Sequence, residues 1–303
     1  MSGVLAAALT PMTAAGSPDH KMAVGHIRWL LRNGCDGVAP LGTTGEANSI
    51  SLADRMALIE AIAAAGIPAD RVIVGTGNCA LGDTVALTRC ALQAGYANAL
   101  VLPPFYYKGV TDDGLYAYFS ALIERVGDAK FRLYLYHFPQ MSAVPVSAAL
   151  IGRLRAAFGD VVAGLKDSSG DWANTQHLID SFPDFRVYSG SEQYLADNVA
   201  AGGVGCISAT VNVTAPLAAQ VLRADPAKRA PLQAELTAIR LALQGFPTIP
   251  AQKRLLEWHT GNAAWRHVQP PLLPLTEAMA ADMRRKVADF PLFREQIALA
   301  AAS

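Results

Sequence analysis

Short, almost uninterrupted apolar segments alternate along the chain with longer segments whose apolar residues recur every three or four positions. The first kind is typical of buried parallel strands, and the second of helices that pack one face on a sheet. Strands are predicted at 4–11, 37–42, 71–77, 97–103, 132–139, 161–166, 185–190 and 203–210, and helices at 22–32, 51–65, 84–94, 112–126, 147–157 and 172–182. Strand–helix units repeated at intervals of roughly 25 to 30 residues predict an α/β fold, a closed parallel (β/α)8 TIM barrel.

An open, doubly wound sheet is the alternative fold. Such sheets usually carry a glycine-rich phosphate turn after the first strand, whereas here the first strand runs into Thr10-Pro11-Met12. The segment beyond the eighth unit has a mostly helical pattern that prolines interrupt. We therefore divide the chain into a barrel that carries the active site, residues 1–224, and a C-terminal helical extension packed on the barrel, residues 225–303.

The composition argues against several functional classes. Charged residues make up 17% of the chain and hydrophobic residues 52%, so we expect a large core. Lys+Arg and Asp+Glu each number 25 and no long run of one sign occurs, which argues against nucleic acid as a partner. The pattern shows neither a signal peptide nor the run of about 18 apolar residues that a membrane span requires. We expect a cytoplasmic protein with no membrane partner.

The four cysteines do not form a recognisable ligand pattern. Cys35, Cys79, Cys90 and Cys206 are scattered, without a C-x-x-C pair or a histidine at ligand spacing. The six histidines are dispersed as well. We expect reduced packing cysteines, no metal site and no cofactor.

One lysine ends an apolar strand. Lys166 follows Val-Val-Ala-Gly-Leu and precedes the polar turn Asp-Ser-Ser-Gly in the segment 161–170. Burial removes hydration from an ammonium and so favours the neutral amine, a nucleophile that condenses with ketones and aldehydes to a Schiff base. A structural lysine paired with a carboxylate such as Asp167 is the alternative that this segment leaves open.

The active site of a (β/α)8 barrel forms at the carboxyl ends of its strands, so the polar residues there are the candidates. These positions are 42–46, 103–108, 136–139, 166–169, 189–192 and 208–210. The hydroxyls and backbone amides of Gly42-Thr-Thr-Gly45 suit a substrate carboxylate, with an ordinary glycine-bracketed loop as the alternative. Tyr136 can pass protons to a carbinolamine at Lys166, with a packing tyrosine as the alternative. Together these residues predict a Schiff-base site.

Three ordered motifs resemble those of the dihydrodipicolinate synthase and N-acetylneuraminate lyase family. They are Gly-Thr-Thr-Gly-Glu at 42–46, Tyr-x-x-Pro at 136–139 and Gly-Leu-Lys-Asp-Ser-Ser at 164–169. The likeness covers the chain from Val4 to about Thr210. It implies a class I aldolase in which Lys166 forms a Schiff base with pyruvate or another 2-oxo acid.

The resemblance also implies roles for the other site residues. Tyr136 relays protons, and Thr43 links it to a second tyrosine, Tyr106. Tyr106 would enter the active site of a neighbouring subunit. The protein would then be a homotetramer built as a dimer of dimers. Thr44 and the loop amides, including that of Gly45, hold the substrate carboxylate. Further substrate contacts are predicted from the strand ends, at Ser168, Gly190 and Ser208, and at His137 for the variable end of the substrate. A satisfied strand-end histidine is the alternative for His137.

Departures from the family pattern narrow the substrate. Dihydrodipicolinate synthases usually carry an arginine two residues after the Tyr-x-x-Pro proline, but this chain has Met141, which cannot supply a guanidinium fork. Ser191-Glu192-Gln193 lacks the acidic pair expected for sialic acid. The segment Ser189-Gly-Ser-Glu192 is closer to the aldolases of 2-keto-3-deoxy sugar acids.

The sequence thus predicts a Schiff-base-forming lyase that acts on pyruvate and an aldehyde or on a 2-keto-3-deoxy sugar acid. The alternatives on the same site are a dehydratase of such a sugar acid, a dihydrodipicolinate synthase and an N-acetylneuraminate lyase. A barrel that binds and senses a 2-oxo acid without turnover is the non-enzymatic alternative. The combination of Lys166, Tyr136, Tyr106 and Thr43 argues against it, because binding alone needs no proton relay.

Overall fold

The computed structural model describes residues 1–294, and its strands form one closed parallel sheet. The strands are β1 (Gly3–Ala6), β2 (Gly37–Val38), β3 (Ile73–Gly75), β4 (Asn98–Val101), β5 (Arg132–His137), β6 (Val162–Asp167), β7 (Arg186–Ser189) and β8 (Gly205–Ser208). They pair in the order β2-β1-β8-β7-β6-β5-β4-β3. A bridge from Val38 to Val72, and a 2.8 Å hydrogen bond from the Gly75 N–H to the Pro40 carbonyl, join the two outer strands. The predicted (β/α)8 barrel is confirmed.

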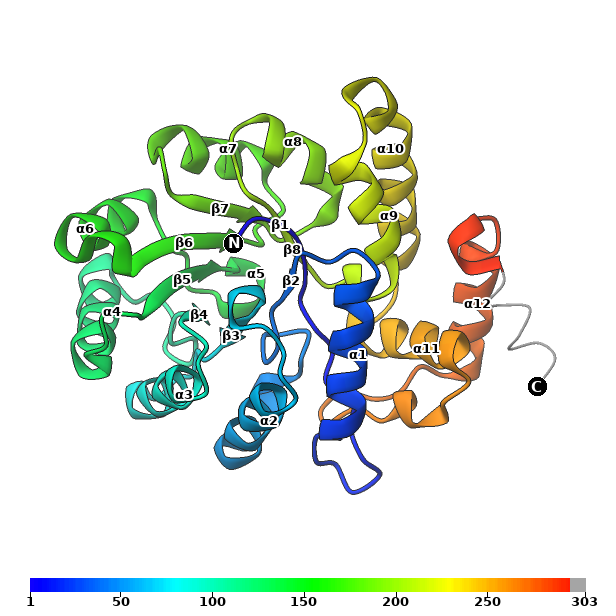
Figure 1. Ribbon diagram of the computed structural model, residues 1–303, viewed down its shortest axis with the longest axis horizontal. Coiled ribbons are helices and arrows are strands. Elements are labelled where there is room, and N and C mark those ends of the chain that lie inside the picture. The colour runs from blue at the N-terminus through cyan, green and yellow to red at the C-terminus, as the bar shows by residue number, and fades with distance from the viewer. Residues whose placement is uncertain (295–303) are drawn as a thin grey trace.

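Helices follow the strands and surround the sheet, which occupies the centre of Figure 1. They are α1 (His20–Arg32), α2 (Leu52–Ala64), α3 (Leu81–Gln93), α4 (Asp112–Val126), α5 (Pro139–Ser142), α6 (Ala148–Phe158), α7 (Trp172–Ser181), α8 (Leu195–Ala200) and α9 (Val211–Arg223). Side-chain caps set several helix starts, for example Ser51, whose hydroxyl accepts from the Asp54 N–H at 3.1 Å. Within residues 1–294, no helix is both long and apolar enough to cross a bilayer.

Additional helices follow the barrel, as predicted, and within residues 1–294 the α-helices among them are α10 (Pro226–Leu243), α11 (Thr248–Thr260) and α12 (Glu277–Val287). Helix α10 packs on α9, and α11 and α12 lie beyond α1 at one side of the barrel (Figure 1). Buried apolar residues of all three helices belong to the same core cluster as those of α1 and α9. The division of the chain after residue 224 stays a prediction, and residues 295–303 of the extension lie outside the described residues.

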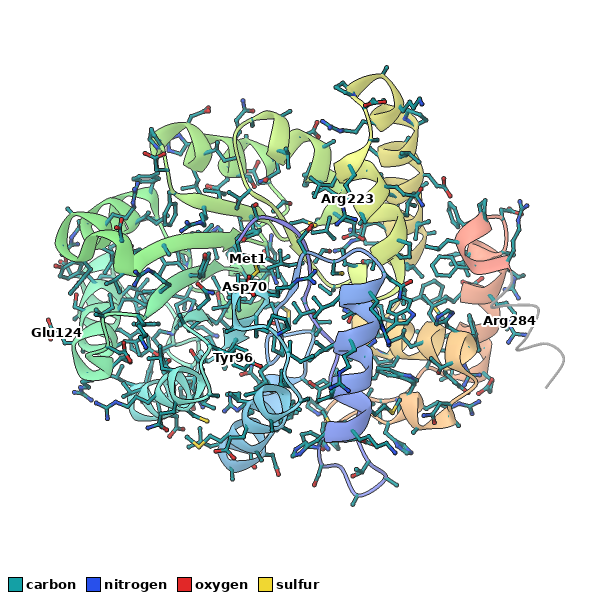
Figure 2. The ribbon with its side chains drawn as sticks, viewed as in Figure 1. Met1, Asp70, Tyr96, Glu124, Arg223 and Arg284 are labelled. Atoms are coloured by element: carbon teal, nitrogen blue, oxygen red, sulfur yellow. The ribbon has the colours of Figure 1, made fainter. Side chains whose placement is uncertain are left out.

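The interior of the barrel is filled with side chains from the strands, as Figure 2 shows. Residues such as Leu5, Ile73, Tyr134 and Tyr188 form a compact inner cluster. Met1 lies near the middle of the strands in the view of Figure 2, and its carbonyl accepts a 2.6 Å hydrogen bond from the Tyr188 hydroxyl. This filled interior leaves the carboxyl ends of the strands as the place for a site.

Candidate active site

Lys166 and Tyr136 are register partners on the neighbouring strands β6 and β5, so their side chains project to the same side of the sheet. The Lys166 Nζ donates to the Tyr136 hydroxyl at 3.2 Å, and both residues are about 95% buried, with 5% and 4% of their surface exposed. The Tyr136 hydroxyl also lies 3.5 Å from Thr43 Oγ1. The three residues thus form one polar chain at the end of an apolar barrel.

Asp167, the next residue of β6, points to the opposite side of the sheet, and its carboxylate is satisfied there. Its Oδ2 accepts from the Thr175 hydroxyl at 2.7 Å and from the Asn174 amide at 2.9 Å, and its Oδ1 accepts from the Ser169 N–H at 2.9 Å. Among residues 1–294, no ion pair joins Lys166 to a carboxylate. Lys166 and Asp167 therefore do not form the ion pair that the structural alternative for Lys166 requires.

A cavity of about 350 Å³ opens over this polar chain. Six of the residues predicted as site residues line it: Thr43, Thr44, Tyr136, Lys166, Ser168 and Gly190. Apolar side chains complete the walls, among them Phe138, Met141, Tyr194, Ile249 and Leu272. A small organic molecule fits a cavity of this size, with the lysine amine at a mostly apolar wall.

The loop after β2 that carries Thr43 and Thr44 is held from both ends. Leu41 and Glu46 flank it with left-handed φ angles of 59° and 57°, a conformation that costs of order 1–3 kcal/mol in a non-glycine residue and is concentrated at functional sites. The buried Glu46 carboxylate pairs with Lys253 of α11 and accepts from the Gln269 N–H at 2.8 Å. Burial lowers the pKa of Lys253, and the attraction of Glu46 opposes that shift. The C-terminal helices thereby hold the threonine loop in place.

Gly190 and Ser168 meet at one wall of the cavity. The Gly190 N–H donates to the Asp167 carbonyl at 2.6 Å. A Cβ at position 190 would collide with Ser168 Oγ, so only glycine permits this approach. The predicted contacts of both residues with a substrate are consistent with this placement.

Four predicted site residues do not line the cavity of the single chain. Gly45 packs against the backbone of Leu41 and of Ala8, just after β1, and the Ser208 hydroxyl donates to the buried Glu192 carboxylate. His137 Nδ1 accepts from the Val146 N–H at 2.9 Å; burial lowers the pKa of His137, although Asp167 opposes the shift. Tyr106 is 73% exposed on the loop after β4, where its ring contacts that of Tyr107. Their functional contacts stay predictions, and for Tyr106 the contact requires a second subunit.

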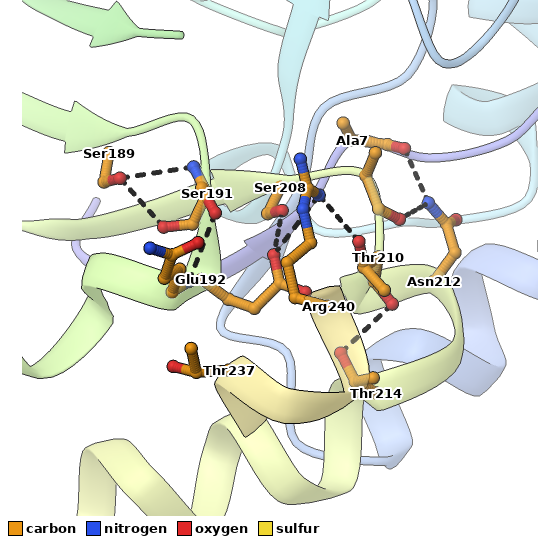
Figure 3. Close-up of polar contacts among 12 residues, drawn as sticks. Ala7, Ser189, Ser191, Glu192, Ser208, Thr210, Asn212, Thr214, Thr237 and Arg240 are labelled. Atoms are coloured by element: carbon orange, nitrogen blue, oxygen red, sulfur yellow. Dashed lines mark hydrogen bonds and ion pairs between the residues drawn. The ribbon is translucent and has the colours of Figure 1, made fainter. Parts of the chain in front are cut away.

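The sequence reasoning missed the contribution of the C-terminal helices to the cavity. Arg240 of α10 and the residues Thr248, Ile249 and Pro250 at the start of α11 all line it. The Arg240 Nη1 donates to Thr210 Oγ1 at 2.7 Å and lies 3.7 Å from Glu192 Oε2, as Figure 3 shows. One signal was available, because Arg240 lies one helical turn after Leu236 and next to Ile239, on the face of α10 that is buried.

Comparison with known proteins identifies the family. The model of the dihydrodipicolinate synthetase family matches residues 1–289. The chain belongs to this family. A protein of Chloroflexus aurantiacus named as an uncharacterised DapA-like lyase is 40% identical over 285 residues, which cover 93% of this chain and 94% of the relative. The family predicted from the three motifs is therefore confirmed, and with it an enzyme family of lyases and synthases.

Solved structures of the family have the same fold. The dihydrodipicolinate synthase from Agrobacterium tumefaciens superposes with a TM-score of 0.87 at 35% identity, covering 98% of this chain and 99% of that one. YagE, a prophage protein of the same family from E. coli, was solved in complex with pyruvate and has a TM-score of 0.87 at 26% identity, with 99% of each chain covered. These neighbours extend the likeness through the C-terminal helices, beyond the segment on which the motifs lie.

Proposed function

We propose that this member of the dihydrodipicolinate synthetase family is a Schiff-base lyase that joins or splits pyruvate and an aldehyde, with a 2-keto-3-deoxy sugar acid as the condensed compound. The observation that carries the proposal is the contact of 3.2 Å from Lys166 Nζ to the Tyr136 hydroxyl at the wall of the cavity. The contact supports the proposal because an amine can act as a nucleophile and the hydroxyl beside it can donate and accept a proton. The pyruvate complex of the relative YagE supports a 2-oxo acid as the ligand.

The reaction begins when the Lys166 amine attacks the keto carbon of the 2-oxo acid. Tyr136 protonates the carbinolamine oxygen, water leaves, and a cationic iminium remains on Lys166. Loss of a C3 proton converts the iminium to an enamine, whose C3 attacks the aldehyde carbon while the aldehyde oxygen takes up a proton. Hydrolysis then releases the product, and cleavage follows the same steps in reverse. Thr43 and Thr44 lie where they can hold the carboxylate of the 2-oxo acid.

The side chain at position 141 supports a second substrate, the aldehyde that accepts the pyruvate unit, other than that of the dihydrodipicolinate synthases. Met141 lines the cavity and is 60% exposed, so this position supplies no guanidinium to a carboxylate of the second substrate. The same iminium can instead expel a C4 hydroxyl, which is the dehydratase alternative. Product analysis separates the two reactions, because cleavage yields pyruvate and an aldehyde whereas dehydration keeps every carbon in one product.

The proposal includes a cytoplasmic homotetramer built from dimers. Tyr106 and Tyr107 support a subunit contact, because they are 73% and 74% exposed side by side on the loop after β4. Exposed aromatic pairs are characteristic of protein–protein interfaces. In such a contact Tyr106 would complete the proton relay of the neighbouring site.

The proposal is tested by trapping the imine. Incubation with pyruvate and borohydride should add a reduced pyruvate unit to the protein. Peptide analysis should place it on Lys166, because among the lysines of residues 1–294 only this one is both buried and at the wall of the main cavity. Lys253 is equally buried but is closed off by Glu46 and the His267 carbonyl, so it provides an internal control.

Lys166→Ala should abolish both the adduct and turnover while leaving the circular dichroism spectrum unchanged. Folded wild-type protein that forms no adduct with pyruvate or with larger 2-oxo acids would overturn the proposal. That result would favour the binding and sensing barrel instead.

A further inference from the structure

A second, smaller cavity adjoins the main one behind Arg240. Its volume is about 40 Å³, and it is lined by Thr210, Arg240, Leu243, Gln244, Thr248, Ala251 and Gln252. Arg240 and Thr248 line both cavities, so the small cavity, here called the distal pocket, extends the main one. A space of this size holds one or two water molecules or the hydroxymethyl end of a substrate.

The distal pocket contains a buried polar group without a partner. Gln252 is 2% exposed, and its Oε1 makes no hydrogen bond within the part of the chain that the structure describes. Buried amides are almost always hydrogen-bonded in native proteins. An acceptor left open in a lined pocket points to a ligand or water that donates a hydrogen bond there.

Charge balance decides which ligand group suits the distal pocket. The Arg240 guanidinium is already paired with Glu192, 3.7 Å away, as Figure 3 shows. A carboxylate would add one uncompensated negative charge beside Glu192, which is fully buried, at the cost of the ligand's hydration. A hydroxyl adds no charge, donates to Gln252 Oε1 and accepts from Arg240 or Thr248. The pocket therefore matches hydroxyls better than it matches a second carboxylate.

We infer that the distal pocket binds the terminal hydroxyl of the aldehyde part of the substrate and makes Arg240, Thr248 and Gln252 specificity-determining residues. This inference rests on the proposed function and narrows its substrate class to hydroxylated aldehydes and the sugar acids made from them. The three residues lie in the C-terminal extension, whereas the lysine, the tyrosine and the threonine loop lie in the barrel. In this inference the barrel residues perform the reaction, and the residues of the C-terminal extension select the aldehyde.

The test compares aldehydes of similar size in the condensation with pyruvate. Wild-type protein should prefer glyceraldehyde to propanal and to succinic semialdehyde in kcat/KM. Gln252→Leu and Thr248→Val remove single hydrogen-bonding groups and should lower the glyceraldehyde-to-propanal ratio by about 10- to 100-fold. The change should fall on the KM for glyceraldehyde, with the KM for pyruvate unchanged. Gln220→Leu, at an exposed position of α9, is the matched control and should keep the wild-type ratio.

The borohydride adduct separates this inference from the proposed function. Pyruvate lacks the aldehyde part that the distal pocket is proposed to bind, so all variants should still form the adduct. If Thr248→Val and Gln252→Leu form the adduct but keep the wild-type glyceraldehyde-to-propanal ratio of kcat/KM, the inference is overturned while the proposed function stands. A preference of the wild-type protein for succinic semialdehyde would overturn the inference in the same way. If Gln252→Leu does not fold, Thr248→Val decides, because Thr248 is exposed and only its hydroxyl is lost.

Discussion

The Tyr136 hydroxyl stands between two polar groups, 3.2 Å from Lys166 Nζ and 3.5 Å from Thr43 Oγ1. From this position it can receive a proton from one side and return it to the other. The Lys166 nitrogen also lies 4.3 Å from the centre of the Tyr136 ring, so this one residue provides both the hydrogen bond and an aromatic surface for the amine. At the residue scale, we expect the proposed chemistry of Lys166 to depend on Tyr136, which contacts the amine with both its hydroxyl and its ring.

Replacing Tyr136 by phenylalanine tests the proton relay. The ring fills the same space, so Tyr136→Phe should fold normally, while kcat falls by about 10²- to 10⁴-fold because proton transfer to the carbinolamine is lost. Steady-state kinetics measures the loss, and adduct formation with borohydride should become slow but remain on Lys166. Wild-type turnover in this variant would show that Tyr136 is only a packing residue.

At the scale of elements, the loop after β2 and helix α11 are joined by a buried ion pair. Glu46 and Lys253 have no exposed side-chain surface, and the Lys253 Nζ also donates to the His267 carbonyl at 2.7 Å. The partners are separated by most of the chain, yet they set the position of Thr43 and Thr44. A buried charge without its partner is costly, so the two elements depend on each other.

Lys253→Met should lower the free energy of unfolding by about 3–5 kcal/mol, because Glu46 is left buried and uncompensated. The double variant Lys253→Met/Glu46→Gln removes the charge and keeps an oxygen for the Gln269 N–H, so it should recover part of the loss. Urea unfolding followed by tryptophan fluorescence measures both. A single variant within about 1 kcal/mol of wild type would argue against this role of the pair.

At the scale of the whole molecule, His26 lies where the first helix, the first strand and helix α9 meet. Its Nε2 donates to Asn212 Oδ1 at 2.8 Å, and the same oxygen accepts from the Leu9 N–H at 3.0 Å. The Asn212 amide donates to the Ala7 carbonyl at 2.7 Å, so the start and the end of the barrel are tied together. Burial lowers the pKa of His26 from 6.5 to about 4, although the hydrogen bond with Asn212 opposes the shift.

The lowered pKa makes global stability depend on pH. The unfolded chain takes up a proton on His26 as pH falls below 6.5, whereas the folded protein does so only near pH 4. Between these two values protonation favours the unfolded chain, so the free energy of unfolding falls as pH falls. The free energy of unfolding should fall by about 2 kcal/mol from pH 7.5 to pH 5 through this residue. Denaturant titrations at both values measure the loss. In His26→Gln the fall in the free energy of unfolding between pH 7.5 and pH 5 should be smaller than in the wild type by about 2 kcal/mol. A fall equal to that of the wild type would exclude His26 as its source.

Much of the fold followed from local patterns in the sequence. Apolar runs and helical periodicity predicted the strands and helices because both depend on neighbours within a few residues. Lys166 at the end of an apolar strand, together with the polar residues at the other strand ends, predicted a Schiff-base site, and the three motifs were enough to predict the family. Each strand, helix and motif was read from residues close together in the chain, and the family followed from the order of the three motifs.

Other features were decided by tertiary structure, because they join residues far apart in sequence. The alternation of side chains along β6 turns Asp167 away from Lys166, but the hydrogen bonds that satisfy its carboxylate there come from helix α7. Closure of the barrel needs the Val38–Val72 bridge. Helix α10 places Arg240 at the main cavity beside Tyr136 and Lys166, and α11 places Gln252 at the distal pocket. Periodicity reports which face of a helix is buried, but it does not report what lies opposite, and only the packed molecule brings the extension onto the barrel.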